Sequence, residues 1–197
     1  MEVNQNQRKR GTGRVAVFGS LRGLCFAAIC AAMSLVLGKF LQIPNPFQSF
    51  IRISFENLPV MLSGIVLGPI GGALVGGVAD LLGCLLYGYE INPIVLLGAV
   101  SVGFLSGLVG HGALQKKTIP RAVLAVLSAH AVGSVLIKSV GLAQWYLASY
   151  DLGLFQFMLW RLVNYLIVGT AECVILCLLL GNRAFRRQLQ SMRGETL

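Results

Sequence analysis

Residues 52–83 carry three conspicuous runs: Arg52-Ile-Ser-Phe-Glu-Asn-Leu-Pro59, Gly68-Pro69-Ile-Gly-Gly72 and Gly76-Gly-Val-Ala-Asp80-Leu-Leu-Gly83. They predict a polar loop, a short apolar helix, a tight turn and a glycine-rich apolar helix with a carboxylate inside it. An ionisable side chain in hydrocarbon is costly unless it is paired or faces a cavity, so such a residue is a candidate functional site. Asp80 is that residue.

The chain as a whole carries more apolar residues than one water-soluble core can hide. Of its 197 residues, 56% are hydrophobic and only 12% are charged, which predicts an integral membrane protein. Runs close to the roughly 20 apolar residues that cross a bilayer cover residues 24–40, 71–87, 93–114, 122–147 and 155–180, and a shorter run covers residues 58–67. We expect an all-α bundle of six transmembrane helices, in which the short helix tilts or ends among its neighbours.

The net charge of +9 predicts how the bundle is oriented. In a six-span arrangement, basic residues gather on one side: Arg8, Lys9, Arg10, Arg14, Arg22, Lys116, Lys117, Arg121, Arg183, Arg186, Arg187 and Arg193. The positive-inside rule assigns that side to the cytoplasm, together with both termini. We expect a basic tail over residues 1–20, a membrane domain over 21–182 and a second basic tail over 183–197. The first apolar run lacks a clear cleavage site and is interpreted as a retained helix.

Motifs for catalysis and metal binding are absent from the sequence. It has no Walker A pattern, no paired-acid or histidine metal motif and no Gly-x-Ser-x-Gly elbow, so we expect neither an enzyme nor a cofactor. The five cysteines lie in apolar runs without a C-x-x-C pair, which favours small buried side chains over a disulfide or metal site.

Small residues recur four positions apart in three of the predicted helices. For Gly72 with Gly76, and for Gly103 with Gly107, we expect close packing of helices inside the bundle. In the first span the repeated residues are alanines, and both internal packing and an exposed face that docks on a partner helix remain open. These are Ala27, Ala28, Ala31 and Ala32.

Depth counting places several ionisable residues in common layers. With a rise of about 1.5 Å per residue, Asp80, Lys138 and Arg161 lie on the order of 10–14 Å below the outer surface. One acid facing two cations leaves a positive excess, which would suit an anionic ligand with a flat ring. The alternative is that Asp80 pairs with a cation only to hold the bundle together. Deeper, His130 and Glu172 are interpreted as a satisfied polar contact.

Helical spacing extends this layer to a predicted pocket that opens outward. Aromatic and amide side chains lie on the same helix faces as these charged residues, and loop residues are expected at the opening of the pocket. The predicted binding residues are Arg52, Asp80, Asn92, Lys138, Trp145, Arg161, Asn164 and Tyr165.

The pattern from Arg52 to Gly83, preceded by the alanine-rich span, resembles the substrate-binding S component of energy-coupling factor (ECF) vitamin transporters, most closely the folate-specific type. The resemblance implies a six-helix subunit of an ECF-type ABC importer in the bacterial cell membrane. Such a subunit binds a vitamin from outside with high affinity, docks on a transmembrane coupling protein and depends on two ATPase subunits. The four alanines would form the docking face, and residues 44–54 would form a gate over the site.

One segment departs from the folate-specific pattern. Where that type shows an aromatic-Pro-Gly-Phe-Thr-Leu run, this chain has Tyr89-Glu-Ile-Asn-Pro-Ile-Val95. Another vitamin, such as pantothenate, is therefore an alternative substrate. A structural membrane protein of the rod-shape type is a second alternative, which the polar layer disfavours, and a membrane enzyme acting on lipid head groups is a third, which would need its charges at the cytoplasmic interface.

Overall fold

The computed structural model describes residues 20–44, 52–111, 118–143, 153–185 and 187–188. Within these ranges the helices are α2 (Leu21–Phe40), α3 (Asn57–Leu67), α4 (Pro69–Tyr87), α5 (Pro93–His111), α6 (Thr118–Ser128), the π-helix η1 (Ala129–Ile137) and α8 (Leu154–Gly181). Five helical segments have the length and composition to cross a membrane, one of them being the continuous stretch Ile119–Ala143. The predicted class, an α-helical membrane bundle, is confirmed.

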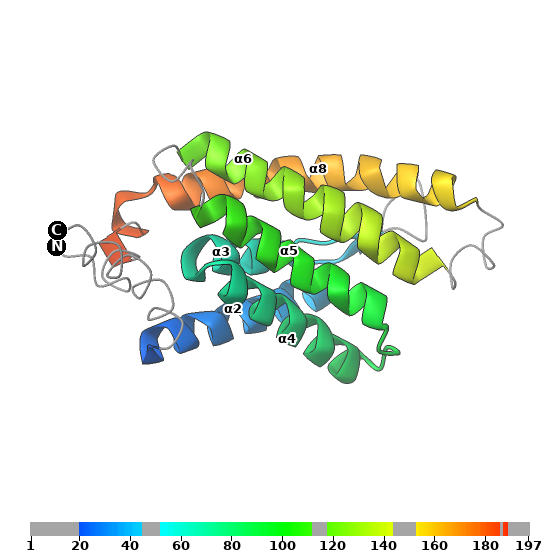
Figure 1. Ribbon diagram of the computed structural model, residues 1–197, viewed down its shortest axis with the longest axis horizontal. Coiled ribbons are helices and arrows are strands. Elements are labelled where there is room, and N and C mark those ends of the chain that lie inside the picture. Colours follow the sequence, from blue (N-terminus) through cyan, green and yellow to red (C-terminus); the bar gives the residue numbers. More distant parts are fainter. Residues whose placement is uncertain (1–19, 45–51, 112–117, 144–152, 186, 189–197) are drawn as a thin grey trace, which may run out of the picture.

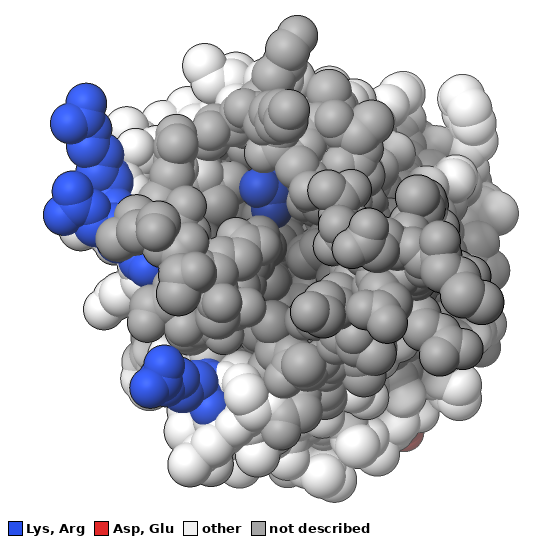
Figure 2. Space-filling view, turned by 60° about the vertical axis from the view of Figure 1, so that its left-hand side comes forward, with Lys and Arg blue, Asp and Glu red and all other residues white. Residues whose placement is uncertain are grey.

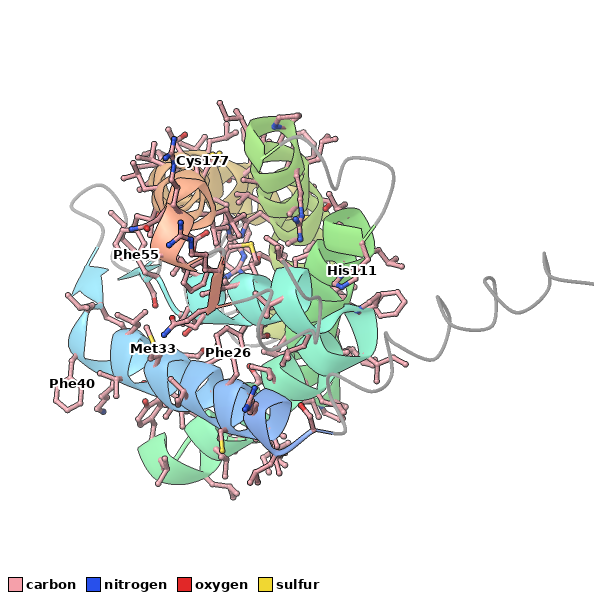
Figure 3. The ribbon with its side chains drawn as sticks, turned by 90° about the vertical axis from the view of Figure 1, so that its left-hand side faces the viewer. Phe26, Met33, Phe40, Phe55, His111 and Cys177 are labelled. Atoms are coloured by element: carbon pink, nitrogen blue, oxygen red, sulfur yellow. The ribbon has the colours of Figure 1, made fainter. Side chains whose placement is uncertain are left out.

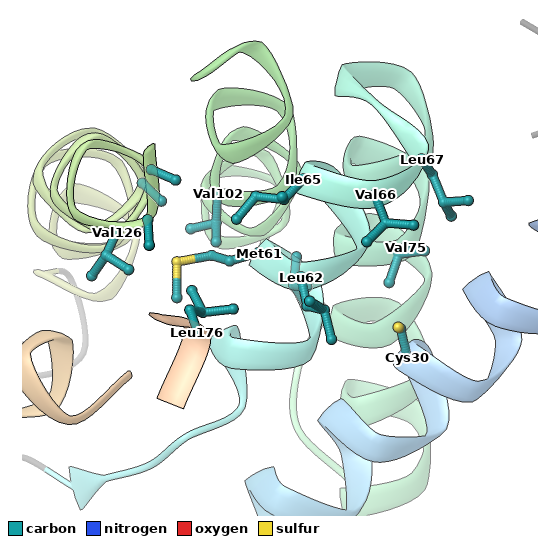
Figure 4. Packing of buried hydrophobic residues seen from close by; sticks show 14 of the residues in the cluster. Cys30, Met61, Leu62, Ile65, Val66, Leu67, Val75, Val102, Val126 and Leu176 are labelled. Carbon is teal, nitrogen blue, oxygen red and sulfur yellow. The ribbon is translucent and has the colours of Figure 1, made fainter. Parts of the chain in front are cut away.

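The short helix α3 forms the centre of this bundle. All eleven of its residues are buried. Met61 and Ile65 pack against Val102 of α5, Val126 of α6 and Leu176 of α8, and Figure 4 shows the cluster that they form. At the far end of α3, Arg121 donates a hydrogen bond of 3.0 Å to the carbonyl of Ile65, where a cation also suits the helix dipole. Because neighbouring helices enclose α3, this helix can be shorter than the thickness of the membrane without exposing its ends to lipid.

Helices α4 and α5 approach each other closely through their glycines. A Cβ on Gly72 would overlap the carbonyl oxygen of Gly103, and one on Gly76 would overlap that of Ala99. Gly107 lies equally close to the backbone at Pro69. The prediction that these glycine pairs serve internal packing is confirmed.

The antiparallel helices give the bundle two distinct ends (Figure 1). We call the end where α2 begins and α8 ends the basic end, because Arg22, Arg183 and Arg187 are exposed there. Figure 2, which turns this end forward, shows basic side chains at several places where the described surface is visible. The opposite end holds the connection from α4 to α5. This distribution fits the charge asymmetry in the sequence.

Large apolar side chains cover the outside of the bundle. Phe40 is 80% exposed and points away from it (Figure 3), and Phe155 and Leu178 are exposed to a similar degree. Such a surface suits lipid chains rather than water.

Two local features differ from a bundle of plain α-helices. Residues Ile43–Pro44 (β1) and Arg52–Ile53 (β2) pair as a short antiparallel ladder, with Pro44 opposite Arg52. The helix after α6 widens into the π-helix η1 and then continues to Ala143. Neither was predicted, because two-residue strands and π-turns leave no periodic signal in the sequence.

Candidate functional site

A cavity of about 600 Å³ lies toward the end opposite the basic end. It is bounded by α2, the start of α3, α4, the start of α5, the residues after η1, and α8. Its polar and aromatic lining comprises Ser34, Gln42, Ser54, Glu56, Asn57, Asp80, Cys84, Tyr87, Tyr89, Glu90, Asn92, Lys138, Arg161 and Tyr165. Small-molecule sites typically measure roughly 300–1,000 Å³, so this cavity has the size and chemistry of a ligand site.

Lys138 forms the charged centre of the cavity and is only 5% exposed. Its Nζ lies 3.7 Å from Oε1 of Glu56 and 4.0 Å from Oδ1 of Asp80. Both distances exceed those of a direct hydrogen bond. Lys138 therefore offsets part of the negative charge of the two carboxylates, which keep hydrogen-bonding capacity for another partner.

Glu56 reaches this position because α3 begins inside the bundle. Its backbone carbonyl accepts a hydrogen bond of 2.7 Å from the hydroxyl of Ser34 on α2. A Cβ added at Gly38, one turn further along α2, would lie only 3.1 Å from Oε2 of Glu56. The small residues of α2 thus leave room for this carboxylate.

Arg161 lines another part of the cavity and is held by neutral groups. Its Nη2 donates to the carbonyl of Ser134 at 2.9 Å and to the hydroxyl of Tyr165 at 3.3 Å. The guanidinium also lies over the rings of Phe157 and Tyr165, at 5.7 and 5.3 Å. A guanidinium has five N–H donors. Within the described parts of the chain, no carboxylate pairs with Arg161, so donors remain for a ligand.

The charge balance of the cavity differs from the predicted positive excess. The described lining contains Glu56, Asp80 and Glu90 against Lys138 and Arg161. The prediction of one acid facing two cations was wrong, because Glu56 and Glu90, which lie in the connections before α3 and after α4, were not counted among the lining residues. The predicted meeting of Asp80 with Lys138 is confirmed, and Arg161 shares their cavity without pairing with either acid.

The two predicted asparagines do not present free amides to the cavity. Asn92 lines it, but its Nδ2 donates to the carbonyl of Gly141 at 2.8 Å and its Oδ1 accepts from the backbone of Ile94 at 2.9 Å. It therefore caps α5 and ties it to the segment after η1. Asn164 is 3% exposed and lies outside the lining. The spacing of Asn164 from Arg161 correctly predicted that both lie on the same, inward face of α8. It could not predict that the cavity does not extend as far as Asn164.

Several predicted residues fall wholly or partly outside the described part of the chain. Trp145 lies there, as do residues 45–51 of the predicted gate. For Arg52 the structure gives only the backbone, in β2. The flanking residues Gln42 and Ser54 both line the cavity, which places the two ends of this loop beside it.

The four alanines of α2 divide between two faces. Ala27 and Ala31 are each 7% exposed and belong to the hydrophobic core. Ala28 and Ala32 are exposed. A partner helix can contact Ala28 and Ala32 without any change in the bundle, but it cannot contact Ala27 and Ala31, which are buried. The prediction that Ala27 and Ala31 are docking residues is therefore corrected, because they are core residues.

Two aromatic residues of the cavity lining, Tyr87 and Tyr89, were not among the predicted binding residues. The hydroxyl of Tyr87 donates to the carbonyl of Leu35, and its ring lies beneath Nζ of Lys39 at 4.9 Å. Tyr89 stands edge-on to Tyr87 with 6.1 Å between ring centres. Their position at the end of a predicted apolar span, next to a polar turn, was the available signal.

The deeper pair is in direct contact, as predicted, but Oε1 of Glu172 is buried without a hydrogen-bond partner among the described residues. Nε2 of His130 hydrogen-bonds to Oε2 of Glu172, and neither residue lines the cavity.

Comparison with protein families shows to which family this helical bundle belongs. The family of ECF-type riboflavin transporter S components matches residues 19–182, which include every transmembrane helix described above. The chain belongs to this family. Its members are S components, the substrate-binding subunits of their transporters, so the resemblance inferred from residues 52–83 is confirmed.

Two curated relatives support the assignment of this S component. The folate transporter FolT of Clostridium novyi (strain NT) is 32% identical over 110 residues, 52% of this chain and 58% of FolT. An uncharacterised protein of Mycoplasma pneumoniae is 25% identical over 104 residues, 53% of this chain and 22% of that protein. The chain thus spans little more than half of the first relative and under a quarter of the second.

Solved structures show the same fold as this S component. FolT bound with folic acid has a TM-score of 0.62 at 23% identity, covering 80% of this chain and 91% of that one. The S component for biotin from an ECF-type ABC transporter has a TM-score of 0.59 at 21% identity, covering 82% and 92%. The names of these proteins mention folate and biotin, and the name of the matching family mentions riboflavin.

Proposed function

We propose that this chain is the high-affinity vitamin-binding subunit of an ECF-type importer in the bacterial cell membrane, with folate or a related pterin as its substrate. The 600 Å³ cavity, with carboxylates at Lys138 and a guanidinium with free donors at Arg161, carries this proposal. The 32% identity to a folate transporter supports the choice of vitamin.

The two charged regions of the cavity suit a ligand with two kinds of polar group. A pterin ring presents amino and ring N–H donors, which carboxylates such as Glu56 and Asp80 can accept. The glutamate portion of folate presents carboxylates, which a guanidinium binds in a bidentate manner. The rings of Tyr87, Tyr89 and Tyr165 supply surfaces against which a flat heterocycle can pack.

Riboflavin is the second candidate, because the matching family is named for it. Its flavin ring could use the same aromatic side chains, but riboflavin has no carboxylate for Arg161. Pantothenate, the earlier alternative, has a carboxylate but no ring. A structural protein of the rod-shape type would have no use for a cavity built around a buried lysine.

The orientation and the partners complete the proposed transport role. The basic end lies in the cytoplasm by the positive-inside rule, so the cavity takes up the vitamin from outside. The exposed Ala28 and Ala32 offer a smooth helix face for close contact with a transmembrane coupling protein. Two ATPase subunits bound to that protein would supply the energy for release inside.

Titration calorimetry of the detergent-purified protein tests the substrate. Folate, riboflavin, biotin and pantothenate are titrated in turn, and mass spectrometry identifies any small molecule that co-purifies. We expect folate or a pterin to bind most tightly. Tighter binding of riboflavin would transfer the proposal to that vitamin, and the absence of binding by all four would contradict the assignment of the cavity.

A further inference from the structure

A buried polar cluster lies deeper in the bundle than the cavity. Glu172 of α8 is completely buried and His130 of η1 is 5% exposed. Neither lines the cavity, so direct contact with the ligand does not explain them. Ionisable groups inside a membrane protein are costly to bury and mark functional positions.

The first route from this cluster to the cavity runs through an aromatic ring. His130 hydrogen-bonds to Glu172, and its ring stacks on that of Tyr165 with 4.8 Å between centres and 25° between planes. The hydroxyl of Tyr165 accepts a hydrogen bond from Nη2 of Arg161. Because the two rings are stacked, the orientation of the His130 ring restricts where the Tyr165 ring, and with it the Tyr165 hydroxyl, can lie.

The second route runs through Ser134, one turn from His130. Nδ1 of His130 lies 3.2 Å from the side-chain hydroxyl of Ser134. The backbone carbonyl of the same residue accepts the other hydrogen bond from Nη2 of Arg161. Both routes thus end on the same nitrogen. Fixing Nη2 at two points restricts the guanidinium and leaves its other donors in a set direction.

We propose that His130 and Glu172 are positioning residues, which hold Tyr165 and Ser134 so that Arg161 is preorganised to bind a carboxylate of the ligand. This inference rests on the proposed function for the identity of that ligand. Preorganisation increases affinity because the freedom of a long side chain is lost before binding rather than during it.

A double variant, His130→Leu with Glu172→Leu, removes the cluster without stranding a buried charge. Replacing both members of a buried pair by apolar residues is often neutral for stability. Glu172→Gln, which keeps the shape of the side chain and an acceptor for His130, is the milder variant. Thr170→Val is the control, because the Thr170 hydroxyl is exposed on α8 and bonds only to the carbonyl of Leu166 at 2.7 Å among the described residues.

Calorimetry compares folate with 6-hydroxymethylpterin, which lacks a carboxylate. The double variant should bind folate about tenfold more weakly, a loss of 1.4 kcal/mol, and bind the pterin normally. In an Arg161→Ala background the double substitution should have no further effect on folate. An equal loss for both ligands, or a further loss without Arg161, would show a merely structural role and overturn the proposal.

A measurement without ligand separates this inference from the choice of vitamin. In protein labelled with ¹⁵N-arginine, the guanidinium signal of Arg161 is assigned by its loss in Arg161→Lys. It should shift in the double variant, shift less in Glu172→Gln and stay unchanged in Thr170→Val. An unchanged signal in the first two overturns the proposal. A shifted signal in a protein that does not bind folate would refute the substrate and leave the positioning role intact.

Discussion

Lys138 and Glu56 meet at the cavity with 3.7 Å between Nζ and Oε1. Lys138 follows the π-helix, whereas Glu56 immediately precedes the central helix α3. Asp80 of α4 approaches the same ammonium at 4.0 Å. One buried cation therefore joins three segments that are distant in sequence, and it brings two carboxylates close together.

Replacing Lys138 by Met should destabilise the protein. Without the ammonium, Glu56 and Asp80 would repel each other at the wall of the cavity. We expect the free energy of unfolding to fall by roughly 1–3 kcal/mol, less than for a fully buried pair, because the Glu56 side chain is 39% exposed. Thermal unfolding in detergent measures the change.

A compensating variant checks the cause of that loss. Adding Glu56→Gln and Asp80→Asn to Lys138→Met removes the repulsion and should restore most of the stability. A triple variant no more stable than Lys138→Met would show that the packing of the lysine side chain, not its charge, is what matters.

Gly103→Ala should weaken the contact between α4 and α5. Its Cβ would overlap the carbonyl oxygen of Gly72, so the two helices would have to separate. Overpacking of this kind costs roughly 1–3 kcal/mol, which a lower unfolding temperature would reveal. Gly181→Ala is the matched control, because a Cβ there meets nothing within 4 Å. Equal stabilities of the two variants would argue against close glycine packing.

Arg161→Ala should reduce folate affinity and leave the protein folded. Hydrogen bonds to charged groups contribute about 1.5–3 kcal/mol, so we expect a loss of about ten- to a hundredfold in calorimetric titrations. Arg22→Ala, an exposed substitution at the basic end, should bind normally. Unchanged affinity in Arg161→Ala would assign the guanidinium to holding η1 and α8 together.

Replacing Ala28 and Ala32 by Phe should separate binding from transport. Both residues are exposed on α2 and neither lines the cavity, so folate affinity should remain normal. Uptake by cells that also express the coupling protein and ATPases should be lost, because bulky side chains prevent close helix contact. Leu178→Phe, at a 70% exposed position of α8, should transport normally. Normal uptake by the alanine variant would refute the docking face.

The sequence predicted those features that follow from apolar length and helical spacing. The end of the third span at Tyr87, the start of the fourth at Pro93 and the use of the glycine pairs for internal packing all follow from local pattern, whereas the contact of Gly72 with Gly103 comes from the structure. The proximity of Asp80 to Lys138 could be predicted because counting residues along each helix gives the depth of a side chain in the bilayer. Two residues at equal depth already agree in one of their three coordinates.

The sequence could not predict what depends on the rotation and depth of whole helices. Glu56 was correctly assigned to the loop before α3, but its place beside Lys138 depends on the depth at which α3 begins in the bundle. Ala27 and Ala28 have the same spacing pattern, and only the packing of α2 on α3 and α4 buries one and exposes the other. The bonds of Asn92 depend on the position of Gly141, far along the chain.

A structure of the protein with folate bound tests the central claim most directly. It should show the pterin N–H groups within hydrogen-bonding distance of the carboxylates of Glu56 and Asp80, and a folate carboxylate on the guanidinium of Arg161. Folate bound outside this cavity, or bound within it with no contact to these three side chains, would contradict the account.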